Sequence, residues 1–224
     1  MKKQSIASAL VAGIALCGAG AAQAQVAGDV LVKLGWNKIV PHVESGELSA
    51  PSLPGSKINI KSASALYATL TYMITDNISI EGLGGLPYKH NVYGAGSVAA
   101  VGKISSIHQI SPTVLLQYRF LAADGPFRPY IGGGPTFAKF YGTRGSAALT
   151  AVTNPGGPPT TIGGDTEWGG TLQAGANYKI DKHWFLDAAV LKTFISTKAQ
   201  LSTGQETKAR LNPLSINASI GYTF

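Results

Sequence analysis

The chain has 224 residues, of which 13% are charged and 28 are glycine, and its formal net charge is +7. An ordinary soluble domain is about a quarter charged, so this composition favours short strands and tight bends over a helical enzyme. No basic run and no alternation of aromatic and basic residues is present, and we therefore expect no nucleic-acid partner.

Residues 1–24 have the pattern of a secretory signal peptide. Lys2-Lys3 forms the positive start, residues 6–16 are apolar but too few to span a membrane as a helix, and Ala22-Gln23-Ala24 is an A-x-A cleavage site. We expect Gln25 to be the mature N-terminus and residues 25–224 to form a single domain.

The only cysteine, Cys17, lies inside this signal, so the mature chain is expected to have no disulfide. A lipoprotein signal is the alternative, but it needs a small residue before the cysteine, and Leu16 stands there. After residue 24 no run of about 18 apolar residues follows, which excludes a helical inner-membrane protein.

Eight segments of the mature chain alternate apolar and polar residues with a period of two, which is typical of β-strands. They are residues 29–37, 64–75, 78–86, 113–120, 128–140, 168–178, 184–194 and 214–224. In the last segment an apolar face opposes small polar residues over about ten residues, as in a transmembrane strand with lipid outside. The sequence therefore predicts an all-β fold, an eight-stranded antiparallel transmembrane β-barrel of the bacterial outer membrane.

The connections between these strands alternate in length. Three are short, whereas residues 38–63, 87–112, 141–167 and 195–212 are long and rich in Gly, Pro, Ser and Thr. Outer-membrane barrels have short periplasmic turns and long external loops, so we expect both termini in the periplasm. Aromatic residues near the short-turn ends predict a periplasmic girdle: Tyr72, Tyr118, Phe120, Tyr130, Tyr178, Trp184, Tyr222 and Phe224.

Several stretches, in this order and spacing, resemble the OmpW family of small outer-membrane channels. They are Gly35-Trp36, Val40-Pro41, residues 70–78, residues 86–90, Gly102-Lys103, residues 111–120, residues 128–132, residues 184–188 and residues 221–224. The resemblance implies a narrow barrel with a hydrophobic upper channel for passive uptake of small hydrophobic molecules. It also implies that the last strand, ending at Phe224, is recognised by the outer-membrane assembly machinery.

The sequence departs from that family in a few places. Tyr88 stands where Phe is usual, and Ala189 and Leu191 fall on the inward face of a strand that usually alternates. Lys192 then points toward lipid, which is costly unless its amine reaches the outer rim. The loop at 141–167 also looks individual.

Charged residues on the inward face of the strands fall at one depth near the periplasmic end. They are Lys33, Glu81, Arg119 and Asp187. We hypothesise that they pair and, with Gln117, Gln173 and Asn177, form a lumen plug, because an eight-stranded barrel is just wide enough for side chains to fill. The alternative is a layer that only stabilises the barrel.

Apolar inward residues predict a hydrophobic channel next to this plug, and ordinary packing of the lumen is the alternative. These residues are Tyr67, Leu83, Leu115 and Met73, with Met73 placed low, near the plug. A solute entering from outside would then leave sideways into the membrane.

No motif predicts catalysis or metal binding, and no cofactor is expected. His42, His90 and His108 fall in or beside long loops, and no G-x-S-x-G or H-E-x-x-H occurs, so we interpret them as polar loop residues. Residues 94–99 mimic a dinucleotide fingerprint but follow no βαβ strand, which predicts a loop or short helix.

Two function classes remain. The first is a channel whose partners are outer-membrane lipid and small hydrophobic solutes. The second is a structural or adhesive barrel whose loops bind partners or phage. A soluble periplasmic lipid-binding barrel is a distant third.

Overall fold

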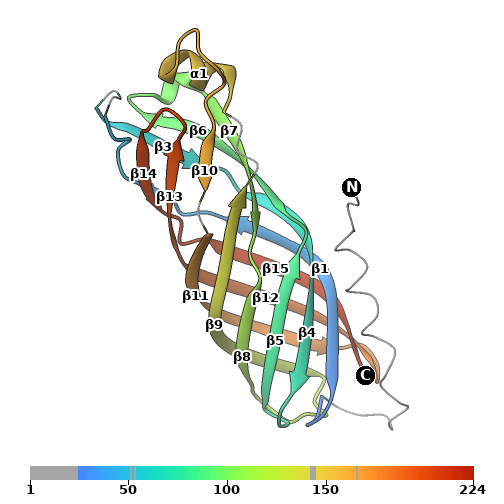
Figure 1. Ribbon diagram of the computed structural model, residues 1–224. Helices are drawn as coiled ribbons and strands as arrows, with labels where there is room; N and C mark the ends of the chain where they lie inside the picture. The colour runs from blue at the N-terminus through green and yellow to red at the C-terminus, as the bar shows by residue number, and fades with distance from the viewer. Residues whose placement is uncertain (1–24, 51, 53, 142–144, 165) are drawn as a thin grey trace, which may run out of the picture.

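The computed structural model describes residues 25–50, 52, 54–141, 145–164 and 166–224, so the predicted signal peptide lies outside the described residues. The chain forms a closed antiparallel barrel of eight strand positions with an extension at one end (Figure 1). In barrel order they are β1 (Val30–Val40), β4 (Ala63–Met73), β5 (Ile78–Gly85) continued by β6 (Tyr88–Gly96), β8 (Thr113–Arg119) preceded by β7 (Lys103–Ile110), β9 (Phe127–Tyr141), β11 (Thr166–Lys179), β12 (Trp184–Phe194) and β15 (Leu214–Thr223).

The first and last strands close the ring. β1 pairs with β15 from Leu31–Thr223 to Val40–Leu214, and on its other side it pairs with β4. β9 pairs with β11 on the far side of the barrel. Closure is required in lipid, which offers no hydrogen bonds to an open sheet edge.

The eight predicted strands are confirmed, with ends that differ by a few residues. The largest difference is at β1, which runs to Val40 rather than ending at residue 37. The predicted alternation is also observed, because Leu214 and Ile216 of β15 are exposed on the outer wall while Ser215 and Asn217 are buried in the lumen. In this barrel the apolar face is therefore the outer one.

The long connections were predicted as loops, and this was wrong for much of their length. They contain β6 and β7, together with β2 (Glu44–Ser45), β3 (Ser56–Ile60), β10 (Ile162–Gly164), β13 (Ser196–Leu201), β14 (Glu206–Arg210), the 3₁₀ helix η2 (Ala99–Val101) and the helix α1 (Ala147–Thr153). These elements extend the wall beyond the barrel and share a core that includes Ile60, Val92, Ile104 and Leu201. Their frequent Gly, Ser and Thr hid the alternation. The stretch 94–99 ends β6 and leads into η2.

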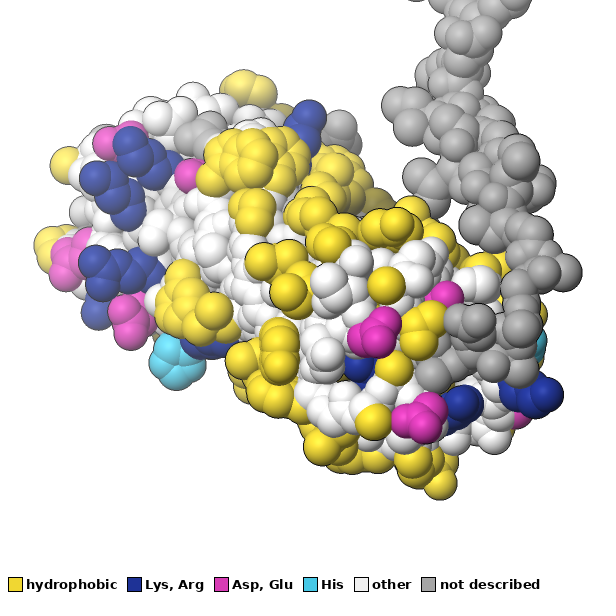
Figure 2. Space-filling model, turned by 90° about the horizontal axis from the view of Figure 1, so that it is seen from below, with side chains coloured by type: hydrophobic (Ala, Val, Ile, Leu, Met, Phe, Trp, Pro, Cys, Tyr) yellow, Lys and Arg dark blue, Asp and Glu magenta, His cyan; other side chains and the backbone are white. Residues whose placement is uncertain are grey.

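Apolar side chains cover the outer wall of the barrel. Figure 2 shows them along its flanks, whereas many Lys, Arg, Asp and Glu side chains gather on the outer extension. Leu34, Leu70, Leu116 and Leu172 are each about 60% exposed, as expected of side chains that face lipid. No helix among the described residues is long and apolar enough to cross a bilayer.

The residues predicted as a girdle lie at the short-turn ends of their strands. Tyr72, Tyr118, Phe120, Tyr178, Trp184 and Phe224 are exposed on the outer wall, and the half-exposed Tyr222 stacks among its neighbours. The placement of Tyr130 there was wrong, because its side chain is 1% exposed and points into the lumen. The Gly-Gly-Gly-Pro run at 132–135 had obscured which face of β9 this residue occupies.

Lys192 avoids the lipid in the way the sequence suggested. Its Nζ donates a hydrogen bond of 2.5 Å to the carbonyl oxygen of Asn212, just before β15. The amine therefore reaches the polar backbone at the outer end of the barrel.

Candidate channel site

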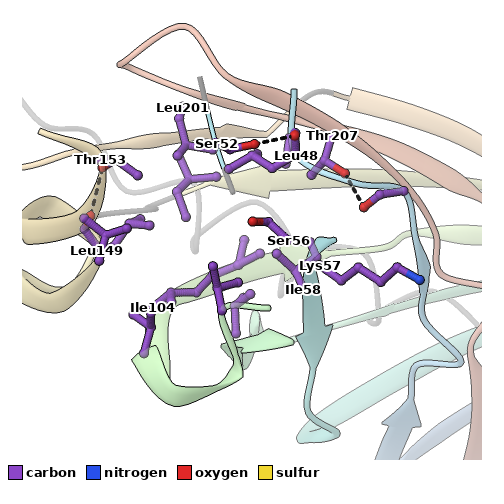
Figure 3. A pocket seen from close by; sticks show the side chains of 18 residues that line it. Leu48, Ser52, Ser56, Lys57, Ile58, Ile104, Leu149, Thr153, Leu201 and Thr207 are labelled. Carbon is purple, nitrogen blue, oxygen red and sulfur yellow. Dashed lines mark hydrogen bonds between the residues drawn. The ribbon is translucent and has the colours of Figure 1, made fainter. Parts of the chain in front are cut away.

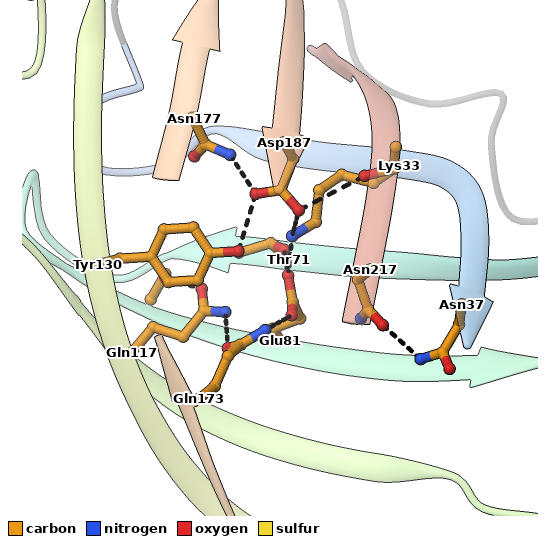
Figure 4. Close-up of polar contacts among 12 residues, drawn as sticks. Lys33, Asn37, Thr71, Glu81, Gln117, Tyr130, Gln173, Asn177, Asp187 and Asn217 are labelled. Carbon is orange, nitrogen blue, oxygen red and sulfur yellow. Dashed lines mark hydrogen bonds and ion pairs between the residues drawn. The ribbon is translucent and has the colours of Figure 1, made fainter. Parts of the chain in front are cut away.

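A buried ion-pair network crosses the lumen near the periplasmic end (Figure 4). Lys33 Nζ on β1 lies 2.7 Å from Glu81 Oε2 on β5 and 3.3 Å from Asp187 Oδ1 on β12. All three side chains are at most 1% exposed. Ions removed from water this completely are stable only when they are paired and hydrogen-bonded. The hydrogen bonds from neighbouring groups therefore decide whether these buried charges stabilise the barrel.

Both carboxylates are satisfied by further donors. Thr71 Oγ1 donates to Glu81 Oε2 at 2.9 Å, and Gln173 Nε2 donates to Glu81 Oε1 at 3.3 Å. Asp187 Oδ2 accepts hydrogen bonds from Tyr130 OH at 2.8 Å and from Asn177 Nδ2 at 2.6 Å. Every oxygen of the two acids therefore has a partner.

Arg119 completes the layer, but it does not pair with an acid as we expected. Its guanidinium donates to Ser79 Oγ at 3.2 Å, to Gln117 Oε1 at 3.0 Å and to Asn177 Oδ1. Its Cζ lies 5.0 Å from the ring centroid of Tyr130. Neutral oxygens and an aromatic face thus hold this buried cation, while Lys33 takes both ion pairs.

The structure brings together all the residues of the predicted plug, called the plug layer below. They are Lys33, Glu81, Arg119, Gln117, Gln173, Asn177 and Asp187, each at most 4% exposed. Strand register explains this meeting, because Asn177 is paired with Asp187 and Glu81 with Thr71.

Sequence reasoning missed Tyr130 and the glycine that makes room for it. A Cβ on Gly175 of β11 would lie 2.6 Å from the Tyr130 ring and hydroxyl. Only glycine at this position lets the tyrosine lie across the lumen. No pattern in the sequence pointed to this contact.

The lower mouth is closed beneath the plug layer by the start of the described chain. Gln25 Oε1 accepts a hydrogen bond from Arg119 at 3.3 Å, and its carbonyl oxygen accepts one from Arg128 at 2.8 Å. Beside it, burial raises the pKa of Asp29, and the nearby Asp76 raises it further. Polar groups therefore fill the periplasmic end as well.

An apolar layer lies directly above the plug layer, as we expected for Tyr67, Leu83 and Leu115. These side chains cluster with Ala189 and Leu191, the two inward apolar residues of β12, and with the ring of Tyr130. The placement of Met73 in this channel was wrong. Met73 is the last residue of β4 and packs with Leu31 and Phe185 at the periplasmic end, below the ion pairs.

A chain of threonine hydroxyls crosses four neighbouring strands above the apolar layer. Thr113 and Thr136 hydrogen-bond at 2.9 Å, Thr136 and Thr171 at 2.5 Å, and Thr171 and Thr193 at 2.8 Å. Each hydroxyl is satisfied by its neighbour, so this part of the wall needs no water to complete its hydrogen bonds.

Three cavities follow one another from the outer extension toward the plug layer. The upper cavity of about 340 Å³ is lined mainly by apolar side chains, among them Leu48, Ile58, Ile104 and Leu149 (Figure 3). A middle cavity of about 20 Å³ shares Ile107 with it.

A lower cavity of about 40 Å³ continues the series, and it shares Ile39 and Ile195 with the middle one. Leu83 and Leu191 line its wall, so it reaches the apolar layer. The cavities thus end at the apolar layer, above the plug layer and away from the periplasm.

The wall beside the lower cavity is interrupted on both sides of β8. Toward β9, the register passes from Thr113–Thr136 to Leu116–Gly133 with no paired residues between them, and Pro135 in this interval has no N–H to donate. Toward β5, residues 84–87 and 110–112 face each other without pairing. The outer end of β8 therefore has gaps in its pairing on both sides, although the N–H of Phe137 still donates to the carbonyl oxygen of Pro112 at 3.0 Å.

A groove of about 570 Å³ runs along the outer wall close to this interruption. Leu116, Ile131 and Leu172 line it, and Gly132 and Gly133 form its floor. The glycines leave a strip of wall without side chains between large apolar residues.

The histidines are dispersed, and no group of three metal-ligating side chains occurs within the described ranges. His108 stacks on Tyr141, with ring centroids 5.7 Å apart, and His183 stacks on Tyr222 at 5.2 Å. The interpretation of His90 and His108 as loop residues was wrong, because they lie on β6 and β7, and His90 is 3% exposed.

Comparisons with known proteins agree with this architecture. The model of the OmpW family matches residues 26–224. Outer membrane protein W of Vibrio cholerae is 31% identical over 206 residues, which are 88% of this chain and 89% of that protein. The dibenzothiophene metabolism operon protein PahQ of Pseudomonas aeruginosa is 30% identical over 182 residues, 79% of each chain.

A solved structure shows the same barrel. The crystal structure of the outer membrane protein OprG from Pseudomonas aeruginosa superposes with a TM-score of 0.81 at 25% sequence identity, over 89% of this chain and 97% of that one. The resemblance seen in the sequence is confirmed: this outer-membrane β-barrel protein belongs to the OmpW family.

Proposed function

We propose that the protein is a passive channel for small hydrophobic molecules, which enter from outside and leave sideways into the membrane above the plug layer. The observation that carries this proposal is the series of three cavities that begins in the outer extension and ends on a filled lumen. An apolar entrance above a closed floor suits solutes that partition into lipid.

The upper cavity supports the chemical class of the solute. Its volume of about 340 Å³ lies near the lower end of the range of about 300–1,000 Å³ that is usual for small-molecule sites. Leu48, Ile58, Ile104 and Leu149 would offer an apolar solute a dry surface. A sugar would lose its hydration there without gaining hydrogen bonds.

The plug layer supports a sideways exit. Its ion pairs and amides fill the lumen at the level of Lys33, so an apolar solute would have to displace buried charges to reach the periplasm. The interrupted wall at the outer end of β8 lies at the height of the lower cavity, where residues of β8 are unpaired on both sides. We place the exit there, next to the glycine-floored groove.

A relative provides independent support. PahQ is named for an operon of dibenzothiophene metabolism, and dibenzothiophene is an apolar tricyclic aromatic compound. Solutes of this size and polarity are the class we propose for the present channel.

Three further proposals concern the chain's biogenesis and chemistry. Residues 1–24 act as a cleaved signal peptide, and the last strand with Phe224 binds the assembly machinery. The barrel performs no catalysis, in keeping with its membership of a family of outer-membrane barrel proteins.

The test is uptake of a labelled small hydrophobic compound, beside a hydrophilic sugar, in deletion cells with and without this protein. Faster entry of the hydrophobic compound alone is the expected result. Equal entry of both compounds, with correctly inserted protein, would favour a structural or adhesive role for the outer extension.

A further inference from the structure

His90 occupies the narrowest part of the proposed path. It lines the middle cavity of about 20 Å³, which lies between the upper and lower cavities. Ile60, Phe140 and Leu211 surround it there, and Gln109 supplies the only other polar side chain of the lining. Any solute that travels from the upper to the lower cavity would pass this imidazole.

A backbone contact fixes which ring nitrogen of His90 carries the proton. Nδ1 lies 2.8 Å from the carbonyl oxygen of Lys61, which can only accept a hydrogen bond. Lys61 is itself held in place, because its N–H donates to the carbonyl oxygen of Asn91 at 2.9 Å. Nδ1 is therefore the protonated nitrogen, and Nε2 has a free lone pair.

This lone pair is buried without a partner. Nε2 of His90 makes no hydrogen bond, although the side chain is 3% exposed. The Gln109 side chain lies close to His90 on the cavity wall, but its amide nitrogen donates to Ser111 Oγ at 2.5 Å. Burial lowers the pKa of His90 by more than the Lys61 carbonyl and the Gln109 side chain raise it, so the imidazole stays neutral and keeps its lone pair at neutral pH.

A water molecule is a poor permanent partner for this nitrogen. A cavity of about 20 Å³ is just large enough for one water, which usually needs about three polar partners. The lining offers His90 and Gln109, and its remaining residues are apolar. A solute whose apolar body lies in the adjoining upper cavity and whose single donor reaches Nε2 fits these surroundings better.

We propose that His90 selects solutes by accepting a hydrogen bond from a hydroxyl group, so that the channel prefers apolar alcohols and phenols to ethers and hydrocarbons of the same size. This inference rests on the proposed channel function and names its preferred solute class. A carboxylate brings only acceptors at neutral pH and an ammonium brings a charge, and neither suits a neutral acceptor among apolar side chains.

The first test measures binding to the purified full-length barrel in lipid nanodiscs. The probes are 2-naphthol and its methyl ether, which differ in the hydroxyl donor, and the readout is the ¹⁵N chemical shift of His90 Nε2. We expect 2-naphthol to move this resonance as the lone pair accepts a hydrogen bond, and the ether to leave it in place. Equal shifts with both probes, or no shift with 2-naphthol, would overturn the inference.

The second test measures entry of the same probes into deletion cells that carry the protein or a variant. His90→Leu removes the acceptor, His90→Gln restores an acceptor oxygen, and His108→Leu is the matched control outside the cavity. The wild type and His108→Leu should admit 2-naphthol about three- to tenfold faster than the ether, as one hydrogen bond allows. The preference should vanish in His90→Leu and return in part in His90→Gln.

The outcomes separate this inference from the proposed function. Equal, protein-dependent entry of both probes would overturn the role of His90 and leave the channel standing. Entry of neither probe would contradict the channel, and the ¹⁵N titration would then decide alone whether His90 accepts a hydroxyl. Heat-modifiable migration on gels establishes that each variant barrel has folded.

Discussion

The plug layer predicts that removing one charge opens the lumen to ions of one sign. Glu81→Ala breaks the 2.7 Å ion pair with Lys33 and takes away the acceptor of Thr71 and Gln173. Removing one partner of a buried pair typically costs about 3–5 kcal/mol, so we expect a loss of unfolding free energy of this order. The space left by the side chain should admit water.

The sign of the remaining charge sets the selectivity. Of the four ions in the layer, Glu81→Ala leaves Lys33, Arg119 and Asp187, which carry a net positive charge, whereas Arg119→Ala leaves Lys33, Glu81 and Asp187, which carry a net negative charge. Anions should therefore pass more readily through the first variant than through the second, and the double variant should leak with less preference.

Conductance and reversal potential in planar bilayers under a KCl gradient measure this effect, and urea unfolding in lipid measures the stability. Ile80→Ala and Phe120→Ala are the controls, because Ile80 points outward from β5 and Phe120 is exposed directly after the end of β8. Unchanged conductance and stability in Glu81→Ala and Arg119→Ala would refute the plug.

Three further predictions follow from single contacts. Gly175→Ala should destabilise the barrel by about 1–3 kcal/mol in urea unfolding, because the new Cβ meets the Tyr130 ring at 2.6 Å. The control is Gly170→Ala, whose new Cβ has nothing within 4 Å and which should be close to wild type in stability. Equal losses of unfolding free energy in the two variants would contradict the reasoning. In the turn before β12, the N–H groups of Trp184 and His183 donate to Asp181 and lower the pKa of its carboxyl. The stabilisation from Asp181 should therefore be present above the unfolded-state pKa of about 3.9 and be lost as the pH falls through the lower folded-state value. Asp181→Asn should remove this step from a pH series of unfolding, and an unchanged series would contradict it. Deleting Phe224 should lower the heat-modifiable, folded fraction in cells, whereas Phe194→Ala at the other end of the barrel should not; equal assembly of both would exclude a role for Phe224 in recognition.

The barrel and its plug layer were predictable from the sequence because both follow from alternation. In a strand with one face in the lumen and the other in lipid, polar and apolar residues alternate with a period of two, and this alternation indicates which face each residue occupies. Once strand directions alternate, Lys33 and Glu81 near strand starts and Arg119 near a strand end must fall at one depth. No long-range information was needed for this step.

Other parts depended on contacts that leave no local pattern. Tyr130 could not be assigned to a face because three glycines and a proline interrupt the alternation of β9, and its place in the lumen requires the missing side chain of Gly175. Met73 was placed on the correct face and low in the barrel, but it was grouped with the channel residues although it lies on the periplasmic side of the ion pairs. The pattern of a single strand does not show at which residue the ion pairs begin. The buried position of His90 depends on strands in the outer extension, where Gly, Ser and Thr weaken the periodicity.

A reversible disulfide across the interrupted wall between β8 and β9 tests the sideways exit most directly. Val114 of β8 and Pro135 of β9 face each other in the register that Thr113–Thr136 and Leu116–Gly133 define. In a regular antiparallel pair the Cα atoms of facing residues lie about 4.5–5.5 Å apart, within the range that a disulfide bridges. The paired positions Leu34 and Ile220, on the uninterrupted seam between β1 and β15, provide the matched control.

The measurement is uptake of a labelled small hydrophobic compound by deletion cells carrying Val114→Cys/Pro135→Cys or the control Leu34→Cys/Ile220→Cys, each oxidised and then reduced. Our account predicts that oxidation slows uptake through the first pair, that reduction restores it, and that the control pair transports equally well in both states. Equal uptake by the oxidised and reduced forms of the first pair, with the disulfide shown to be complete, would contradict a sideways exit at this wall.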